Sequence, residues 1–137
     1  MKESISTTAS PAPIGPYSQG LRIGSLIFVS GQGPLDPAVG CVPRGIEAQT
    51  HQVLRNIRSI LAADGSSMDD VVKVTAHLAD LADFEAFNRV YGDYFRPPYP
   101  VRTTVGSQLL GILVEIDVIA APTAERPPAG AGDGGPR

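Results

Sequence analysis

Cysteine is almost absent from this sequence of 137 residues, in which Cys41 is the only one. A single thiol cannot form a disulfide within the chain, which agrees with a reducing compartment. Cys41 lies in a turn-rich loop, and we interpret it as an ordinary loop thiol. The two histidines, His51 and His77, stand far from it and from each other, so no zinc-site spacing is present. No metal is expected.

Two other absences exclude classes of partner. The chain has no run of lysines or arginines and carries a net charge of −3, so nothing in it is typical of a surface that binds a phosphate backbone. No apolar stretch approaches the roughly 20 residues that a membrane span needs, and the N-terminus lacks the charged start and apolar region of a signal peptide. We therefore expect a cytoplasmic protein that contacts neither nucleic acid nor membrane.

Residues that hold common cofactors are also scarce. Lys2 and Lys73 are the only lysines, and Lys2 stands at the terminus, so a Schiff base with pyridoxal phosphate is not expected. The "GQG" at Gly31 to Gly33 precedes a proline and no helix, which argues against a phosphate-binding loop. The sequence therefore favours neither pyridoxal phosphate nor a nucleotide held by a phosphate loop.

What is present is enough for one folded domain. Hydrophobic residues make up 42% of the chain and charged residues 18%, a balance that supplies a core. From residue 123 onward the sequence "TAERPPAGAGDGGPR" is rich in Pro, Gly and Ala and has no apolar period. We predict a domain at residues 1–122 and a disordered tail at residues 123–137.

Hydrophobic periodicity predicts the elements of this domain. Apolar residues recur at helical spacing over residues 46–63, and Asp80 is placed to cap a second helix whose aromatic residues lie three or four positions apart. Alternating or short apolar runs indicate strands. These strands are expected at residues 21–23, 26–29, within 69–80, at 101–107 and at 113–120, with a short additional one at 4–7.

This order of elements indicates an α+β fold. Two helices can cover only one face of a sheet of four to six strands, so the other face needs a partner or water. If the last two strands pair as a hairpin, their apolar faces coincide only in registers that place Arg102 and Thr104 beside Glu115 and Asp117 on the bare face. The alternation would then leave Val101 on the core side.

Two interpretations of Arg102 follow from that pattern. It forms a cross-strand ion pair of modest strength, or its guanidinium holds a small carboxylate while a nearby glutamate handles protons. Spacing alone does not choose between them.

Five motifs resemble the RidA/YjgF/UK114 family of reactive-intermediate deaminases. They are "IGPYSQ" at residues 14–19, "FVSGQGPLDP" at 28–37, "ADLADFEAFNRVYGDYF" at 79–95, "PVRTTV" at 100–105 and "VEIDVIA" at 114–120. The resemblance implies a chorismate-mutase-like single domain with a mixed sheet and two helices on one face. It also implies a homotrimer with a central β-barrel and clefts at the subunit interfaces. The activity implied is hydrolysis of carboxylate-bearing enamines and imines, of the 2-aminoacrylate and 2-iminobutanoate type, to a 2-keto acid and ammonia without metal or cofactor.

The resemblance also implies roles for individual residues. Arg102 matches the arginine that binds the substrate carboxylate, and Glu115 matches the acid that positions or activates water. Tyr17 matches the aromatic residue that closes the cleft. The remaining positions near the cleft are Ser30, Gly31 and Asn88, and Thr104 stands where several members have cysteine. The loop "GSQLLGIL" lacks the proline usual there, which bears on the choice of substrate.

The sequence leaves other functions open. The family also contains members described as chaperones, small-carboxylate-binding modules and RNA-cleaving translation inhibitors. A catabolic deaminase for an aminomuconate-type substrate is a further alternative. Retention of both Arg102 and Glu115 favours the enzyme, and the negative net charge counts against RNA.

Overall fold

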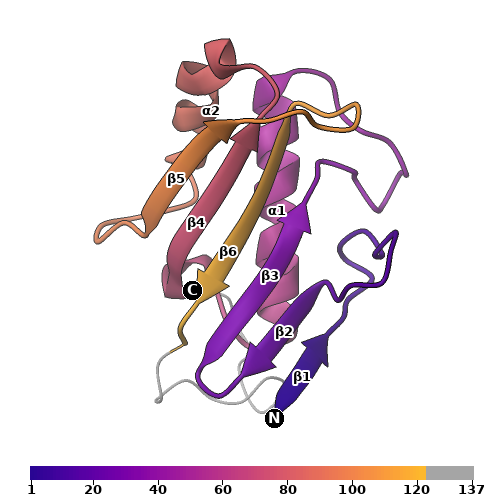
Figure 1. Cartoon of the computed structure of the whole chain (residues 1–137), viewed down its shortest axis with the longest axis vertical. Helices are drawn as coiled ribbons and strands as arrows, with labels where there is room; N and C mark the ends of the chain where they lie inside the picture. The colour runs from indigo at the N-terminus through magenta and orange to yellow at the C-terminus, as the bar shows by residue number, and fades with distance from the viewer. Residues whose placement is uncertain (123–137) are drawn as a thin grey trace.

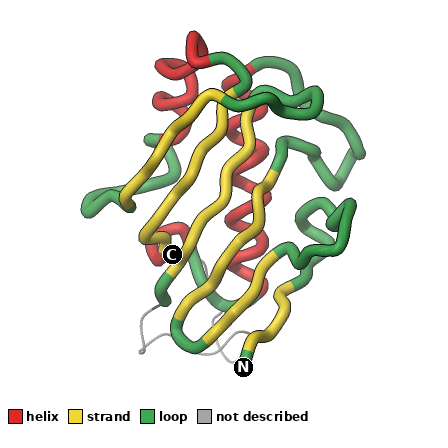
Figure 2. The backbone as a smooth tube through the Cα atoms, in the orientation of Figure 1, coloured by secondary structure: helices red, strands yellow, loops and turns green. Residues whose placement is uncertain are grey.

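A computed structural model describes residues 1–122 of the chain (Figure 1). The predicted tail, residues 123–137, lies outside the described residues, so the division into domain and tail stays a prediction. Within residues 1–122, six strands form one sheet in the order β1-β2-β3-β6-β4-β5. Both helices lie on the same face of this sheet (Figures 1 and 2).

The sheet is mixed. Neighbouring strands are antiparallel except for β4 and β5, which are parallel. The predicted α+β class is therefore confirmed. The strands are β1 (Lys2–Ile5), β2 (Gly20–Ile23), β3 (Leu26–Gln32), β4 (Val71–Leu78), β5 (Val101–Gly106) and β6 (Val114–Ala120).

The N-terminal half of the sheet follows from turn chemistry. β2 and β3 form the predicted hairpin around Gly24 and Ser25, and Gly24 adopts a positive φ of 57°, which glycine accepts without a steric penalty. The strand expected at residues 4–7 occurs two residues earlier, as β1. It pairs with β2 and buries Ile5 at the sheet edge.

Helix α1 (Ile46–Ala63) begins and ends at the residues that its periodicity predicts. Its apolar stripe includes Val53, Ile57 and Ile60, and all three are fully buried. The helix stops where Gly65 adopts a φ of 74°. This helix covers the centre of one face of the sheet and closes the main core.

Helix α2 (Phe84–Tyr91) starts later than its predicted cap. The Asp80 carboxylate accepts a hydrogen bond from the N–H of Ala82 at 2.9 Å, which begins a 3₁₀ turn at Leu81–Asp83. The α-helix follows that turn directly. Asp80 therefore caps the turn that leads into the helix.

The predicted hairpin between the last two strands is wrong. β5 pairs only with β4, and β6 is inserted between β3 and β4. Helix α2 lies between β4 and β5 in the sequence and brings the chain back so that β5 pairs with β4 in parallel. Parallel neighbours require such a crossover connection. The chain then crosses over β4 through residues 107–113 and returns antiparallel as β6 (Figure 1).

This topology changes the face on which Arg102 lies. Arg102 is opposite Val74 and Thr104 is opposite Ala76, and both β4 residues are fully buried beneath the helices. Arg102 and Thr104 therefore point toward the helix layer. The alternate side of β5 is exposed rather than packed on the core, since Val101 retains 67% of its accessible surface.

Glu115 and Asp117 lie on the opposite face. They pair with His77 and Thr75 of β4, whose side chains point away from the helices. The expectation that the arginine and these two carboxylates share one face is therefore wrong. Alternation correctly divides β5 and β6 into two faces, but the division alone does not say which face meets a helix.

Two irregularities modify the sheet. β3 carries one extra residue between Val29 and Gln32, so that Ser30 and Gly31 stand opposite the single residue Asp117 of β6. A similar shift near the start of β4 turns Val72 outward, although strict alternation with the buried Val74 and Ala76 would place it on the core side.

Candidate functional site

Arg102 lies against three aromatic rings of α2. Its guanidinium carbon is 4.6 Å from the ring centroid of Tyr91, 5.4 Å from that of Phe87 and 5.7 Å from that of Phe84. Such distances permit cation–π attraction. Among residues 1–122, Arg102 forms no ion pair with any carboxylate. The predicted cross-strand ion pair is therefore absent from the described chain, and the arginine charge has aromatic neighbours instead.

Three polar atoms beside this arginine are buried without a hydrogen-bond partner in the described chain, and one of them is the hydroxyl of Tyr91. The Thr104 hydroxyl, two residues along β5 on the same face, makes no hydrogen bond within the described chain, and neither does the side-chain oxygen of Asn88. Asn88 shares one face of α2 with Phe84 and Tyr91, at spacings of four and three residues. A buried polar atom without a partner is costly, and its presence points to a ligand or a neighbouring molecule.

We call Arg102, Thr104 and Asn88 the arginine cluster. The aromatic rings beside the cluster belong largely to the core, because Phe87 and Tyr91 are buried. Burial raises the pKa of the Tyr91 phenol, and the adjacent Arg102 charge offsets part of that shift. The cluster thus has the chemistry of an anion site: a partly covered guanidinium with neutral polar groups next to it.

Glu115 belongs to a second group on the other face of the sheet. It packs against the backbone of Gly31 so closely that a β-carbon at residue 31 would lie 2.5 Å from a Glu115 carboxylate oxygen. Only glycine leaves room for this contact. Within the described part of the chain, no basic side chain pairs with Glu115, so its carboxylate is available to solvent or substrate.

Ser30 and Tyr17 complete the second group. Ser30 donates two hydrogen bonds to the carbonyl of Gln19, from its N–H at 2.9 Å and from its hydroxyl at 3.0 Å. Tyr17 lies in the loop before β2, where its hydroxyl accepts a hydrogen bond from the N–H of Ile14 at 3.2 Å. Tyr17 and Ser30 line one recess of about 380 Å³ on the bare face of the sheet, beside Phe28. We call Tyr17, Ser30, Gly31 and Glu115 the glutamate group.

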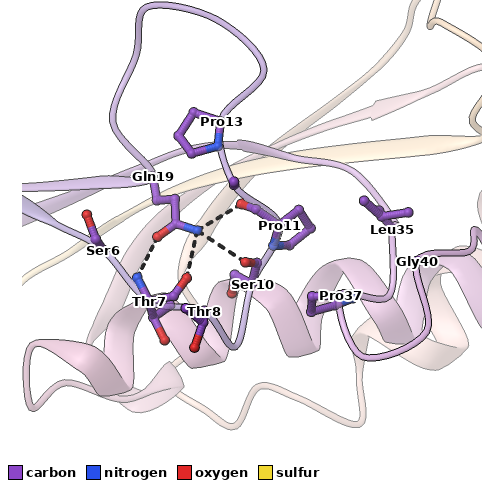
Figure 3. Close-up of a pocket in the computed structure, with 11 residues that line it drawn as sticks. Ser6, Thr7, Thr8, Ser10, Pro11, Pro13, Gln19, Leu35, Pro37 and Gly40 are labelled. Atoms are coloured by element: carbon purple, nitrogen blue, oxygen red, sulfur yellow. Dashed lines mark hydrogen bonds between the residues drawn. The ribbon is translucent and has the colours of Figure 1, made fainter.

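Gln19 holds the loop that carries Tyr17, and sequence reasoning missed it. Its side chain is 4% exposed. The amide oxygen accepts from the N–H of Thr7 at 2.7 Å, and the amide nitrogen donates to the carbonyls of Thr7 at 3.0 Å, Ser10 at 3.3 Å and Pro11 at 2.8 Å (Figure 3). The motif "IGPYSQ" places Gln19 directly after a Pro- and Gly-rich loop, but its partners are backbone groups, which leave no mark in the sequence.

The hydrogen-bonded side chain of Gln19 borders a pocket of about 590 Å³, which lies between the N-terminal segment and the loop around Pro37 (Figure 3). Its walls are made of hydroxyl, proline and aliphatic groups, and none of the predicted site residues lines it. The pocket therefore belongs to neither the arginine cluster nor the glutamate group.

The structure brings the predicted site residues together as two groups rather than one. The arginine cluster is on the helix side of the edge strand β5, and the glutamate group is on the bare side at β3 and β6. β4 and the thickness of the sheet separate them. A single chain therefore does not bring Arg102 and Glu115 to one substrate.

The described residues offer little to hold a metal. Residues 1–122 contain no group of three or more His, Cys, Asp or Glu side chains arranged for a metal ion. His51 hydrogen-bonds to the Tyr94 hydroxyl at 2.9 Å, and His77 to the Ser107 hydroxyl at 2.7 Å. In the same part of the chain, no helix has the length and hydropathy to cross a membrane.

Comparison with known proteins gives consistent matches. A family model described as Endoribonuclease L-PSP matches residues 7–122. A RutC family protein of Pyrococcus horikoshii is 47% identical over 123 residues, which cover 88% of this chain and 98% of that protein. Reactive Intermediate Deaminase A of Arabidopsis thaliana is 45% identical over 122 residues, 87% of this chain and 65% of that protein.

A solved structure agrees in fold. The crystal structure of Escherichia coli TdcF with bound serine superimposes with a TM-score of 0.84 at 36% sequence identity. The match covers 88% of this chain and 99% of TdcF.

Proposed function

The chain belongs to the family described as Endoribonuclease L-PSP, the RidA/YjgF family, and from this premise we propose that it is a hydrolytic deaminase of reactive enamines and imines. The substrates are carboxylate-bearing species of the 2-aminoacrylate or 2-iminobutanoate type. The products are a 2-keto acid and ammonia, and the reaction uses no cofactor. Deaminase names among the relatives support this proposal.

One observation carries the proposal: Arg102 has no carboxylate partner among residues 1–122, and polar atoms of Asn88, Tyr91 and Thr104 are buried beside it without a hydrogen-bond partner there. A guanidinium binds a carboxylate with two parallel hydrogen bonds, which orients a planar substrate as well as holding it. The related TdcF was crystallised with bound serine, a small molecule with a carboxylate, which is consistent with such a site.

The chemistry needs water and a proton acceptor. Water attacks the C=N carbon of the protonated imine, Glu115 accepts a proton from that water, and the C=N electron pair moves to nitrogen, which gives a carbinolamine. Glu115 then returns its proton to the amino group, the C–N bond breaks to release ammonia, and the hydroxyl proton passes to Glu115 as the C–O bond becomes the carbonyl of the 2-keto acid. Ammonia or solvent takes this last proton from Glu115. An enamine enters the same path after protonation at carbon makes it an imine. Placement and proton transfer suffice, and the latter is typically worth about 10²–10⁴-fold.

The separation of the two groups leads to the assembly that we propose. Arg102 and Glu115 lie on opposite faces of one sheet, so a substrate that contacts both must sit between two copies of the chain. A homotrimer with its clefts at the subunit interfaces meets this requirement. The bare sheet face, where Phe28 and Val105 are exposed, is the surface that the neighbouring copies would cover.

A coupled assay tests the function. A pyridoxal enzyme generates imines from several amino acids while 2-keto acid release is timed with and without this protein. We expect faster release with the wild type and a loss of about tenfold to a hundredfold in Arg102→Lys, because lysine keeps the charge without the planar fork. Arg89→Lys is the matched control, since Arg89 lies on α2, the helix that carries the rings around Arg102, but is exposed and paired with Glu47.

Equal specific activity of the wild type and Arg102→Lys toward every carboxylate-bearing imine would overturn the catalytic assignment. Binding of 2-oxobutanoate without any acceleration of imine hydrolysis would instead support the alternative, a non-catalytic carboxylate-binding module. The same assay with aminomuconate-type substrates distinguishes a catabolic deaminase.

A further inference from the structure

The aromatic rings around Arg102 form an arrangement that the proposed reaction does not by itself explain. Arg102 extends from the edge strand β5, while Phe84, Phe87 and Tyr91 all come from one face of α2. Three rings therefore approach one guanidinium from a single element. A long arginine side chain on an edge strand would otherwise have many rotamers available.

We propose that Tyr91 and Phe84 are positioning residues that hold the Arg102 guanidinium in the orientation in which it binds a carboxylate. This inference rests on the proposed carboxylate-binding role of Arg102. It goes further than that role, because it assigns affinity for the substrate to two residues that need not touch the substrate.

The phenylalanine rings restrict the rotamers of the Arg102 side chain without occupying its N–H donors. Phenylalanine rings contain no conventional hydrogen-bond acceptor, so the guanidinium N–H groups facing away from them stay available for a ligand. Attraction to a ring quadrupole strengthens when the cation is shielded from water, and Phe87 and Tyr91 are both buried. The two phenylalanine rings therefore hold the arginine without competing with a carboxylate, whereas the Tyr91 hydroxyl is an acceptor beside the guanidinium, and Tyr91→Phe tests whether it competes.

The two positioning residues differ in burial, which makes the inference testable without unfolding the protein. Tyr91 is buried and also contacts the ring of Phe95 at a centroid distance of 4.5 Å. Phe84 is 39% exposed and lies at the start of α2. Removing the Phe84 ring should therefore disturb the fold far less than removing that of Tyr91.

The test compares ring removal with hydroxyl removal. In Phe84→Leu and Tyr91→Leu, we expect the KM for carboxylate-bearing imines and the Kd of 2-oxobutanoate to rise about fivefold to tenfold, with kcat within about twofold of the wild type. In Tyr91→Phe, which keeps the ring, the affinity should return to near the wild-type value. Calorimetry with 2-oxobutanoate reports the binding directly.

Two controls separate positioning from packing. Tyr94→Leu removes a ring that lies 5.5 Å from another arginine, Arg58, and should leave both constants unchanged. The amide 2-oxobutanamide lacks the carboxylate, so its weak binding should not differ between the wild type and the ring variants.

The experiment distinguishes failure of the proposed function from failure of the positioning role. If wild-type protein does not bind 2-oxobutanoate, the proposed function fails, and the inference fails with it. If the wild type binds and both leucine variants bind equally well, the function stands and the positioning role is overturned. A rise in Kd for Tyr94→Leu as large as that for Phe84→Leu would also overturn it, because loss of general packing would then account for the effect.

Discussion

Gly31 lies against the Glu115 carboxylate, and its lack of a side chain allows this contact. Because a β-carbon there would lie 2.5 Å from a Glu115 carboxylate oxygen, Gly31→Ala must displace the carboxylate or the strand. A shift of about 1 Å in a reacting group can cost roughly 10²-fold in rate, so we expect kcat to fall by about that factor while 2-oxobutanoate still binds. Steady-state kinetics and calorimetry check the two parts.

Gly92→Ala is the control for that variant. A β-carbon at Gly92 would meet its nearest neighbour at 3.5 Å, an ordinary contact, and its φ of −61° suits any residue. If both alanine variants keep full activity, then Glu115 does not need its place against the backbone of residue 31.

Asp117 makes stability depend on pH. Burial raises the pKa of its carboxyl above the ordinary value of 3.8, and the nearby His77 and Lys73 offset part of the rise. Between the ordinary and the raised pKa, the folded chain binds more protons than the unfolded chain. The free energy of unfolding therefore falls as pH rises through this window, and the loss persists at higher pH.

Asp117→Asn should consequently be more stable than the wild type at pH 7, with a difference that shrinks as pH falls toward 3.8 and below. Urea unfolding midpoints at several pH values and one protein concentration measure this. Asp93→Asn, at an exposed carboxylate, is the control. An Asp117→Asn protein less stable than the wild type at pH 7 would show that the ionised carboxylate stabilises the fold.

At the scale of elements, the N-terminal segment depends on one side chain. The Gln19 amide makes hydrogen bonds to the backbone of Thr7, Ser10 and Pro11 and has little access to water. Gln19→Ala removes these bonds, and we expect a loss of about 2 kcal/mol in the free energy of unfolding. The amide proton of Thr7 should also exchange faster with solvent.

Gln108→Ala is the matched control, because Gln108 is exposed and makes no side-chain hydrogen bond within residues 1–122. Urea unfolding and hydrogen exchange of both variants provide the measurement. Unchanged protection of Thr7 in Gln19→Ala would mean that other contacts hold the segment.

The elements themselves were largely predictable, and their pairing was not. Helix α1 is predicted to the residue because its apolar stripe repeats over five turns and Gly65 ends it. The β2–β3 hairpin is equally local, since its turn lies between its strands. The partner of β5 depends instead on where α2 returns the chain, and alternation along β5 contains no information about that.

The candidate site was also predictable only in part: its residues were, and their arrangement in space was not. The family resemblance supplied Arg102, Glu115 and the residues around them, but their distribution over two faces follows from topology alone. Of the aromatic residues of α2, Phe87 and Tyr91 are core and Phe84 is exposed. Their contact with Arg102 could not be predicted, because it depends on how α2 packs against β5. Gln19 was overlooked because its partners are backbone groups, which every sequence has.

At the scale of the whole molecule, we expect three chains in each particle. Light scattering at micromolar concentration should give about three times the chain mass of 14.3 kDa. A mass of one chain would remove both the trimer and the interfacial site.

Mixing variants tests how the site is divided between chains. Arg102→Lys and Glu115→Gln proteins should each have little activity alone. If each site takes its arginine from one chain and its glutamate from another, trimers reassembled from equal amounts of both should recover about a quarter of wild-type activity. Unfolding and refolding the two proteins together, with each refolded separately as the control, provides the measurement. No recovery would mean that both residues act from the same chain.

The placement of Arg102 and Glu115 on opposite faces of the sheet has a consequence for gene dosage. Each chain of such a trimer would serve two sites, giving its arginine to one and its glutamate to another. A chain with one altered group would then disable one site of three, whereas a chain with both groups altered would disable two. In a cell that expresses a normal and a defective copy of the gene, the burden of the defect would therefore depend on whether it affects one face of the sheet or both.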